Sequence, residues 1–269
     1  MLFRSYRAID FDTLQQAYYE QMEALMDGGV DMFLIETAFD TLNVKAALAA
    51  ADNLFSCRAK RLPIMLSVTI ADAAGRMLSG QSMEALLASV AHAELFSVGL
   101  NCSFGAEQML PFLKQLSAAP YFVSAYPNAG IPDAMGTYDQ TPEMMAASVG
   151  RFMDAGLVNI VGGCCGSTPE HIAAIARRAA QQEQMRQPSE QGVAWLAGLD
   201  GFDSRGAFIN VGERCNVAGS RKFLRLVKEG AYDEALSIAR SQVRAGAMVL
   251  DINMDDAMLD AEREMVHML

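Results

Sequence analysis

Short apolar runs alternate along this chain with longer segments in which apolar residues recur every three or four positions. Runs of the first kind are typical of buried strands, and segments of the second kind are typical of amphipathic helices. Strands that alternate with helices in this way predict a parallel sheet with helices packed against it. In the first two thirds of the chain, the predicted strands are 31–36, 62–70, 96–101, 121–125 and 157–162.

Several predicted helices have recognisable beginnings. Ser82 can accept a hydrogen bond from the first turn of a helix over 83–94. Two Thr-Pro-Glu tripeptides, which begin at Thr141 and Thr168, place a capping hydroxyl before a proline at the first helical position and an acid in the first turn. Each of these helices follows one of the predicted strands.

The composition changes between Gln181 and Gln191, where Gln, Glu, Arg, Pro and Ser replace the apolar pattern. We therefore predict a linker over 183–204, between a first domain over 1–182 and a second domain over 205–269. In the second domain the pattern restarts with a strand over Ala207–Val211, a helix over 219–245 that Gly230 interrupts, a strand over 247–252 and a final helix from about 257.

The number of strands limits the possible folds. Five βα units are too few to close an eight-stranded barrel, and two more after a linker are too few to form a domain. An open sheet of five strands is the alternative, but the sequence begins with a helix that lacks a preceding strand. We therefore expect the chain to be a piece of a longer protein.

Composition and charge exclude several classes of partner. The chain has 269 residues, of which 52% are hydrophobic, so it can bury a large core. Its net charge of −11 provides no basic surface for nucleic acid or for an anionic membrane. No apolar run approaches the roughly 18 residues of a membrane-spanning helix, and the first residues lack the apolar core of a signal peptide. We expect a cytoplasmic protein with neither a nucleic-acid partner nor a membrane partner.

Three cysteines follow predicted strands of the first domain. Cys102 ends the run over 96–101, and Cys164 and Cys165 lie on a glycine-containing turn after the strand over 157–162. In parallel α/β folds, functional groups gather at the carboxyl ends of the strands, so the three thiols can meet at one edge of the sheet. In a cytoplasmic chain, thiols bind metals or react more often than they form disulfides, and a bridge between adjacent cysteines would be strained.

Three thiolates with an open fourth position are typical of a catalytic zinc site. An all-sulfur site is poorly suited to forming hydroxide and well suited to holding an incoming thiol as a thiolate, which predicts thiol alkylation. The alternative interpretation is that Cys164 and Cys165 are small buried residues beside a glycine turn. The remaining cysteines and the histidines are expected not to be ligands: Cys57, Cys215, His92, His171 and His267.

Four motifs of the first domain are recognisable, namely Glu36-Thr37-Ala38-Phe39-Asp40-Thr41-Leu42-Asn43, Gly99-Leu100-Asn101-Cys102, Tyr126-Pro127-Asn128-Ala129-Gly130 and Gly162-Gly163-Cys164-Cys165-Gly166. Together they resemble the zinc-bearing homocysteine-binding barrel of the cobalamin-dependent methionine synthases, over most of residues 5–180. After the predicted linker come Asn210-Val211-Gly212-Glu213-Arg214-Cys215-Asn216-Val217 and Asp251-Ile252-Asn253-Met254-Asp255. These two segments resemble the opening strands of the methyltetrahydrofolate-binding barrel of the same family.

The resemblance implies a fold and a set of site residues. The implied fold class is α/β, with a partial TIM (β/α)8 barrel of about five βα units followed by the first βα units of a second TIM-like barrel. Glu36 is implied to hold the substrate ammonium group, and Asn128 is a possible fourth metal ligand when substrate is absent. The implied zinc ligands, with homocysteine sulfur as the incoming ligand, are Cys102, Cys164 and Cys165. The implied pterin-binding residues of the second domain are Glu213, Asn216, Asp251 and Asn253.

The implied activity is methyl transfer from 5-methyltetrahydrofolate, by way of methylcobalamin, to homocysteine, which gives methionine. The cobalamin-binding domain of an intact enzyme would be a partner of the two substrate domains, because no cobalamin-binding segment occurs in this sequence. The first strands of the family's barrel are also missing, and Cys215 stands where the family usually has threonine. Two alternatives stay open: a cobalamin-independent homocysteine S-methyltransferase with a betaine or sulfonium donor, and a zinc-binding module without catalytic activity.

Overall fold

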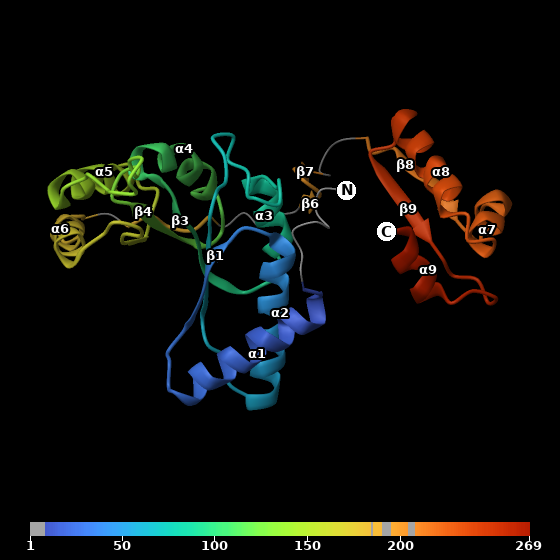
Figure 1. Ribbon diagram of the computed structural model, residues 1–269, viewed down its shortest axis with the longest axis horizontal. Coiled ribbons are helices and arrows are strands. Elements are labelled where there is room, and N and C mark those ends of the chain that lie inside the picture. Colours follow the sequence, from blue (N-terminus) through green and yellow to red (C-terminus); the bar gives the residue numbers. More distant parts are fainter. Residues whose placement is uncertain (1–8, 184, 190–194, 204–207) are drawn as a thin grey trace. The chain divides into compact units, whose positions relative to one another are not determined.

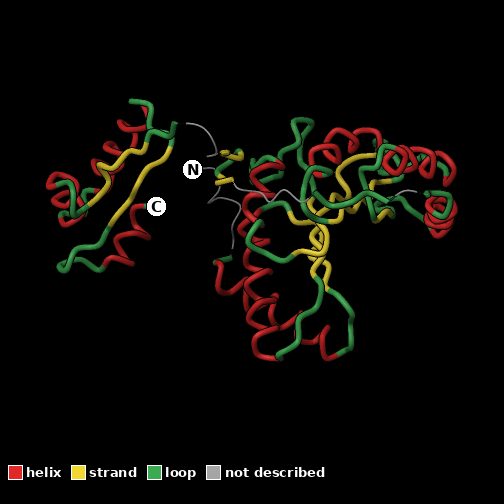
Figure 2. The backbone as a smooth tube through the Cα atoms, turned by 180° about the vertical axis from the view of Figure 1, so that it is seen from behind, coloured by secondary structure: helices red, strands yellow, loops and turns green. Residues whose placement is uncertain are grey.

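The computed structural model describes residues 9–183, 185–189, 195–203 and 208–269. The chain forms two compact units, Met1–Asp203 and Ser204–Leu269 (Figure 1). Within each unit, strands alternate with helices along the backbone (Figure 2). No helix among the described residues is long and apolar enough to cross a membrane.

The first unit is built on a parallel sheet of five strands, whose order in space is the same as their order in the chain. Its elements are α1 (Phe11–Asp27), β1 (Phe33–Ala38), α2 (Thr41–Arg58), β2 (Ile64–Val68), α3 (Met83–Val90), β3 (Leu95–Gly105), α4 (Ala106–Leu116), β4 (Phe122–Asn128), α5 (Pro142–Asp154), β5 (Ile160–Val161), α6 (Pro169–Ala179), β6 (Trp195–Ala197) and β7 (Gly201–Asp203). Sequential parallel strands joined by helices are the arrangement of a TIM barrel. The predicted α/β class is confirmed, and the sheet is consistent with part of such a barrel.

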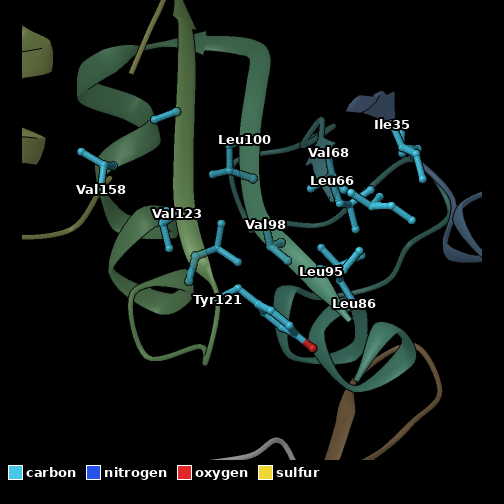
Figure 3. Close-up of a cluster of buried hydrophobic side chains, with 14 of the residues drawn as sticks. Ile35, Leu66, Val68, Leu86, Leu95, Val98, Leu100, Tyr121, Val123 and Val158 are labelled. Carbon is cyan, nitrogen blue, oxygen red and sulfur yellow. The ribbon is translucent and has the colours of Figure 1, made fainter. Parts of the chain in front are cut away.

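The core of the first unit lies between the sheet and its helices. Apolar residues at alternate strand positions pack there with helix residues such as Leu86 of α3, and Figure 3 shows Leu66, Val68, Val98, Leu100 and Val123 among them. Because successive side chains of a strand point to opposite faces, the intervening positions face the other side of the sheet. Those positions carry small polar side chains that are also fully buried, namely Ser67, Ser97 and Ser124.

The structure differs from the sequence-based expectation in the segment 183–204, which we predicted as a linker. Arg186 is only 7% exposed, and its guanidinium donates hydrogen bonds to the carbonyl oxygens of Ser117, Ala119 and Tyr121 at 2.6, 2.8 and 2.7 Å. Asn159 in turn donates to the carbonyl oxygen of Arg186 at 2.7 Å. A polar composition therefore did not mean exposure here, because the five donors of a guanidinium can satisfy backbone carbonyls.

The end of the same segment forms an antiparallel hairpin of β6 and β7, which packs on the first unit. The backbone N–H of Ser82, before α3, donates to the carbonyl oxygen of Leu199 at 2.8 Å. Arg76 makes an ion pair with Asp200 at 2.8 Å. The first unit thus extends to Asp203. Residues 184, 190–194 and 204 of the predicted linker lie outside the described part of the chain.

Over its described residues, 208–269, the second unit contains two parallel strands and three helices: β8 (Val211–Asn216), α7 (Arg221–Lys228), α8 (Tyr232–Arg244), β9 (Val249–Asn253) and α9 (Ala261–Met268). The predicted break at Gly230 is confirmed, because this residue lies between α7 and α8 with a φ of 68°. The strand predicted over Ala207–Val211 was placed too early. It shares only Val211 with β8, since the charged side chains of this half-exposed strand conceal its pattern, and Ala207 lies outside the described residues.

Candidate metal centre

The structure brings three cysteine thiols together at the carboxyl ends of β3 and β5. The Sγ atoms of Cys102, Cys164 and Cys165 all lie within 4.8 Å of one another, and those of Cys102 and Cys165 are 3.5 Å apart. Tetrahedral zinc with sulfur at about 2.3 Å places its sulfur ligands roughly 3.8 Å apart. The three thiols therefore fit such an ion with small shifts, and they leave the fourth position to another ligand.

The turn that carries Cys164 and Cys165 is held by the end of the neighbouring strand β4. The backbone N–H of Cys164 donates to the carbonyl oxygen of Pro127 at 2.8 Å, and Ala129 donates its N–H to the carbonyl oxygen of Cys165 at 2.9 Å. Asn128, which is 4% exposed, accepts the N–H of Cys165 on its Oδ1 at 3.1 Å. In the structure, the side chain of Asn128 thus orients the cysteine turn, and its role as a metal ligand stays a prediction.

Gly166 closes the cysteine turn in a conformation that other residues rarely adopt. Its φ is 78°, and a Cβ atom at this position would lie 2.4 Å from the ring of Tyr138. The half-buried Tyr138 belongs to the loop that follows β4, so this loop packs directly on the turn. The role of Tyr138 could not be predicted from the sequence, because nothing in the local pattern of its loop indicates what the ring contacts.

The thiols influence one another electrostatically. Burial and the charges of Cys102 and Cys165 raise the pKa of Cys164 to about 11. The pKa of Cys165 is lowered, chiefly because the thiol of Cys102 donates a hydrogen bond to it, with a further contribution from the hydroxyl of Tyr138. Without a cation, the cluster thus retains protons that a bound metal ion would displace.

Cys102 follows a buried asparagine, Asn101, to which the sequence pattern assigns no role. Asn101 is 1% exposed, and its Oδ1 accepts hydrogen bonds from Ser67 Oγ at 2.7 Å and from the N–H of Thr37 at 3.2 Å. Its Nδ2 donates to Thr37 Oγ1 at 2.8 Å. One carboxamide therefore joins the ends of β1, β2 and β3. In the sequence, the role of Asn101 was indicated only by its position as a polar residue at the end of an apolar run.

Glu36, the predicted ligand of a substrate ammonium group, is an exposed residue of β1. Its charge acts on Tyr126 of β4, whose pKa is raised mainly by burial and additionally by Glu36. An exposed carboxylate can accept an ammonium group. The assignment of Glu36 to substrate binding nevertheless stays a prediction.

His171, which we expected not to be a ligand, is engaged by the protein at both ring nitrogens. Its Nδ1 accepts the N–H of Thr168 at 3.2 Å in the capping box of α6, and its Nε2 lies 2.8 Å from the carbonyl oxygen of Gln140. The side chain is 6% exposed. The His171 side chain therefore stabilises the beginning of α6 and connects it to the loop before α5.

In the second unit, the structure brings two of the four predicted pterin-binding residues together. Asn216 and Asn253 are register partners at the carboxyl ends of β8 and β9. Their Oδ1 atoms accept backbone N–H groups of the following turns, at 2.9 Å from Ala218 and 2.7 Å from Asp255. The other two residues, Glu213 and Asp251, are exposed on the same strands.

A family model described as homocysteine S-methyltransferase matches residues 1–179, and a model described as pterin binding enzyme matches residues 212–269. The fold is similar to two crystal structures of the homocysteine methyltransferase MmuM from Escherichia coli, each 23% identical to this chain. The apo form has a TM-score of 0.51, with 65% of this chain and 59% of that chain covered. The metallated form has a TM-score of 0.53, with 64% and 54% covered. This chain thus spans less than two thirds of either relative.

Proposed function

Because this chain belongs to the homocysteine S-methyltransferase family, we propose that its first unit binds homocysteine and activates the substrate thiol on a zinc ion held by Cys102, Cys164 and Cys165. The observation that carries this proposal is the convergence of three thiols from two separate strand ends to within 4.8 Å. Zinc, when bound, would keep the thiol of the substrate deprotonated at neutral pH and would thereby make it a nucleophile.

The protein residues supply the rest of the site. Cys165 is the exposed member of the cluster, so the substrate sulfur would approach on its side. Asn128 and the end of β4 hold the cysteine turn in place. Three anionic ligands donate more charge to the metal ion than neutral ligands would, so the bound substrate sulfur stays reactive toward a methyl donor. Glu36 would bind the ammonium group of the amino acid and so orient the substrate.

We further propose that the methyl group comes from methylcobalamin, which 5-methyltetrahydrofolate on the second unit would regenerate. This is the reaction of the cobalamin-dependent methionine synthases. It is supported by the pterin binding match over 212–269, which follows the homocysteine S-methyltransferase match over 1–179 along the chain. Glu213, Asn216, Asp251 and Asn253 offer carboxylates and amides at or near the strand ends, which suits the donor-rich and acceptor-rich edge of a pterin ring. A cobalamin-binding domain would be the partner that both units serve.

A second candidate is a homocysteine S-methyltransferase that takes its methyl group directly from a betaine or sulfonium donor. The similarity of the first unit to the MmuM structures supports this candidate about as well as the pterin binding match supports the first candidate. The two candidates differ in their donor, so methyl transfer to homocysteine from methylcobalamin and from S-methylmethionine should be compared. Transfer from S-methylmethionine alone would establish the second candidate.

The shared part of both candidates is tested by metal analysis and X-ray absorption at the zinc edge. We expect about one zinc per chain with three sulfur neighbours, and a fourth sulfur after homocysteine is added. Cys57→Ala is the matched control, because Cys57 is an exposed cysteine outside the cluster. Zinc content that is unchanged in a Cys102→Ala, Cys164→Ala double variant would exclude the proposed site.

A further inference from the structure

We propose that Asn101 is a positioning residue that couples the thiol cluster to the Glu36 end of β1. It sets the distance between the place that binds the sulfur of an amino thiol and the place that binds its ammonium group. The proposal rests on the proposed function of the first unit. Its basis is the position of the Asn101 carboxamide, which lies beside Cys102 in the chain and is hydrogen-bonded to Thr37, the neighbour of Glu36.

The contact with Thr37 is made twice by the same carboxamide. Oδ1 of Asn101 accepts the backbone N–H of Thr37, and Nδ2 donates to the hydroxyl of Thr37. A third hydrogen bond, from Ser67 on β2, holds Oδ1 from the strand that lies between β1 and β3. Because Asn101 is 1% exposed, water does not compete for these bonds. The orientation of the carboxamide is therefore determined by all three strands.

Both residues at the ends of this network have unusual backbones. Thr37 and Cys102 each have a φ of 58°, in the left-handed region that non-glycine residues, and β-branched residues above all, seldom occupy. The strand register shifts at the same places, between Ile35 and Ala38 in β1 and between Asn101 and Gly105 in β3. Such conformations persist only where the surrounding structure determines them, and they concentrate at functional sites. Here the Asn101 carboxamide is the link between the two strained positions.

This link has a consequence for substrate recognition. An amino thiol would be held at two points, with its sulfur at the thiol cluster and its ammonium group at Glu36. The relative position of these points depends on the path of the backbone through Thr37 in β1 and Cys102 in β3. Loss of the link should therefore weaken binding of homocysteine more than binding of 4-mercaptobutanoate, which has the same chain length but no ammonium group.

Two variants separate the two ends of the network. Asn101→Ala removes every bond, whereas Thr37→Val removes only the hydroxyl that accepts from Asn101 and keeps the branched shape. The control is Ser97→Ala, which deletes a buried hydroxyl from β3 for which the structure shows no hydrogen-bond partner among the described residues. Zinc affinity is measured by competition with a chromophoric chelator. The affinities of the zinc-loaded chain for homocysteine and for 4-mercaptobutanoate are measured by calorimetry.

We expect Asn101→Ala to weaken zinc binding about 10-fold or more, as loss of a supporting hydrogen bond at a metal site commonly does. It should also lower the preference for homocysteine over 4-mercaptobutanoate about 10-fold, the effect of a weakened hydrogen bond to a charged group. Thr37→Val should lower the preference and leave zinc affinity as in the wild type. Ser97→Ala should change neither.

The proposal is overturned if Asn101→Ala behaves like Ser97→Ala, or if it weakens zinc binding without changing the preference. Circular dichroism shows whether the variants fold. If Asn101→Ala does not fold, an unchanged preference in Thr37→Val overturns the proposal just as well. A folded wild-type chain that binds no zinc would instead refute the proposed function, and this inference with it.

Discussion

The Sγ atoms of Cys102 and Cys165 lie 3.5 Å apart, although the residues are 63 positions apart in the sequence. Each thiol is presented by the end of a different strand of one parallel sheet, with β4 between them. The distance is short enough for a hydrogen bond between the two sulfurs and for both sulfurs to bind one metal ion. It is also short enough for oxidation of the pair after a small movement.

This proximity predicts a redox reaction of the metal-free chain. The pKa of Cys165 is lowered chiefly by its hydrogen bond from Cys102, so a larger fraction of Cys165 is thiolate at neutral pH than of an ordinary cysteine, and its side chain is exposed. With oxidised glutathione, we expect the Cys165 thiolate to form a mixed disulfide, which Cys102 then resolves to a Cys102–Cys165 disulfide with release of two molecules of reduced glutathione. Peptide mapping by mass spectrometry should identify this crosslink, and bound zinc should prevent it. Glutathione retained only on Cys57 would contradict the prediction.

A second prediction concerns the turn that carries Cys164 and Cys165. Gly166→Ala should destabilise the chain by more than the roughly 1–2 kcal/mol that a left-handed backbone costs an alanine, because the new Cβ would also meet the ring of Tyr138 at 2.4 Å. Gly136→Ala is the matched control, since Gly136 has a φ of 80° and open space around its missing Cβ. Urea unfolding measures both effects.

The same clash can be removed by a second substitution. Tyr138→Gly removes both the ring and the Tyr138 Cβ, which would lie 2.5 Å from the new Cβ. It should therefore cost less stability in the Gly166→Ala background than in the wild type. If Gly166→Ala and Gly136→Ala lower the free energy of unfolding equally, the close approach of Tyr138 to the turn does not add to the cost of Gly166→Ala.

A third prediction concerns Arg186, whose buried guanidinium satisfies three backbone carbonyls. Arg186→Ala should reduce the free energy of unfolding by about 3 kcal/mol, because it leaves buried acceptors without donors. Arg151→Ala is the control, since Arg151 is exposed and its ion pair with Glu107 should contribute less than about 1 kcal/mol. Equal losses in urea unfolding would show that residues near Arg186 do not belong to the cooperative unit.

A fourth prediction follows from the pKa of Cys164, which burial and the neighbouring thiols raise to about 11 from 9.0. A thiol whose pKa is raised in the folded state contributes stability that is complete below its ordinary pKa and is lost as the pH rises through the folded value. Between about pH 9 and 11, the reduced, metal-free wild type should therefore lose stability relative to Cys164→Ser. Urea unfolding at several pH values tests this, and parallel curves for the two proteins would contradict it.

The local sequence pattern was sufficient to predict those features of the fold that depend on residues close together in the chain. The alternation of apolar runs with helical segments correctly predicted the parallel sheet of the first unit and the break at Gly230. The position of Cys102 and Cys164 after strands was enough to expect their thiols at one edge, because parallel strands point their carboxyl ends the same way.

The pattern was insufficient where contacts join distant segments. The polar composition of 183–204 predicted a linker, yet Arg186 and the hairpin of β6 and β7 pack on the first unit. The charged residues of β8 likewise concealed a strand whose Gly212 and Cys215 are buried. In both cases the partners that bury the segment come from elsewhere in the chain, so composition alone could not reveal them.

The sequence by itself thus determined the class of fold and the identity of the three thiols, because strand and helix periodicity and residue chemistry are written locally. The tertiary structure alone decided how these thiols are held: Asn128 beneath the cysteine turn, Tyr138 over Gly166, and Asn101 between Cys102 and Thr37. Each of these contacts depends on the register of neighbouring strands and on the path of a loop. Both are set by packing of the whole unit, and no local pattern of residues contains them.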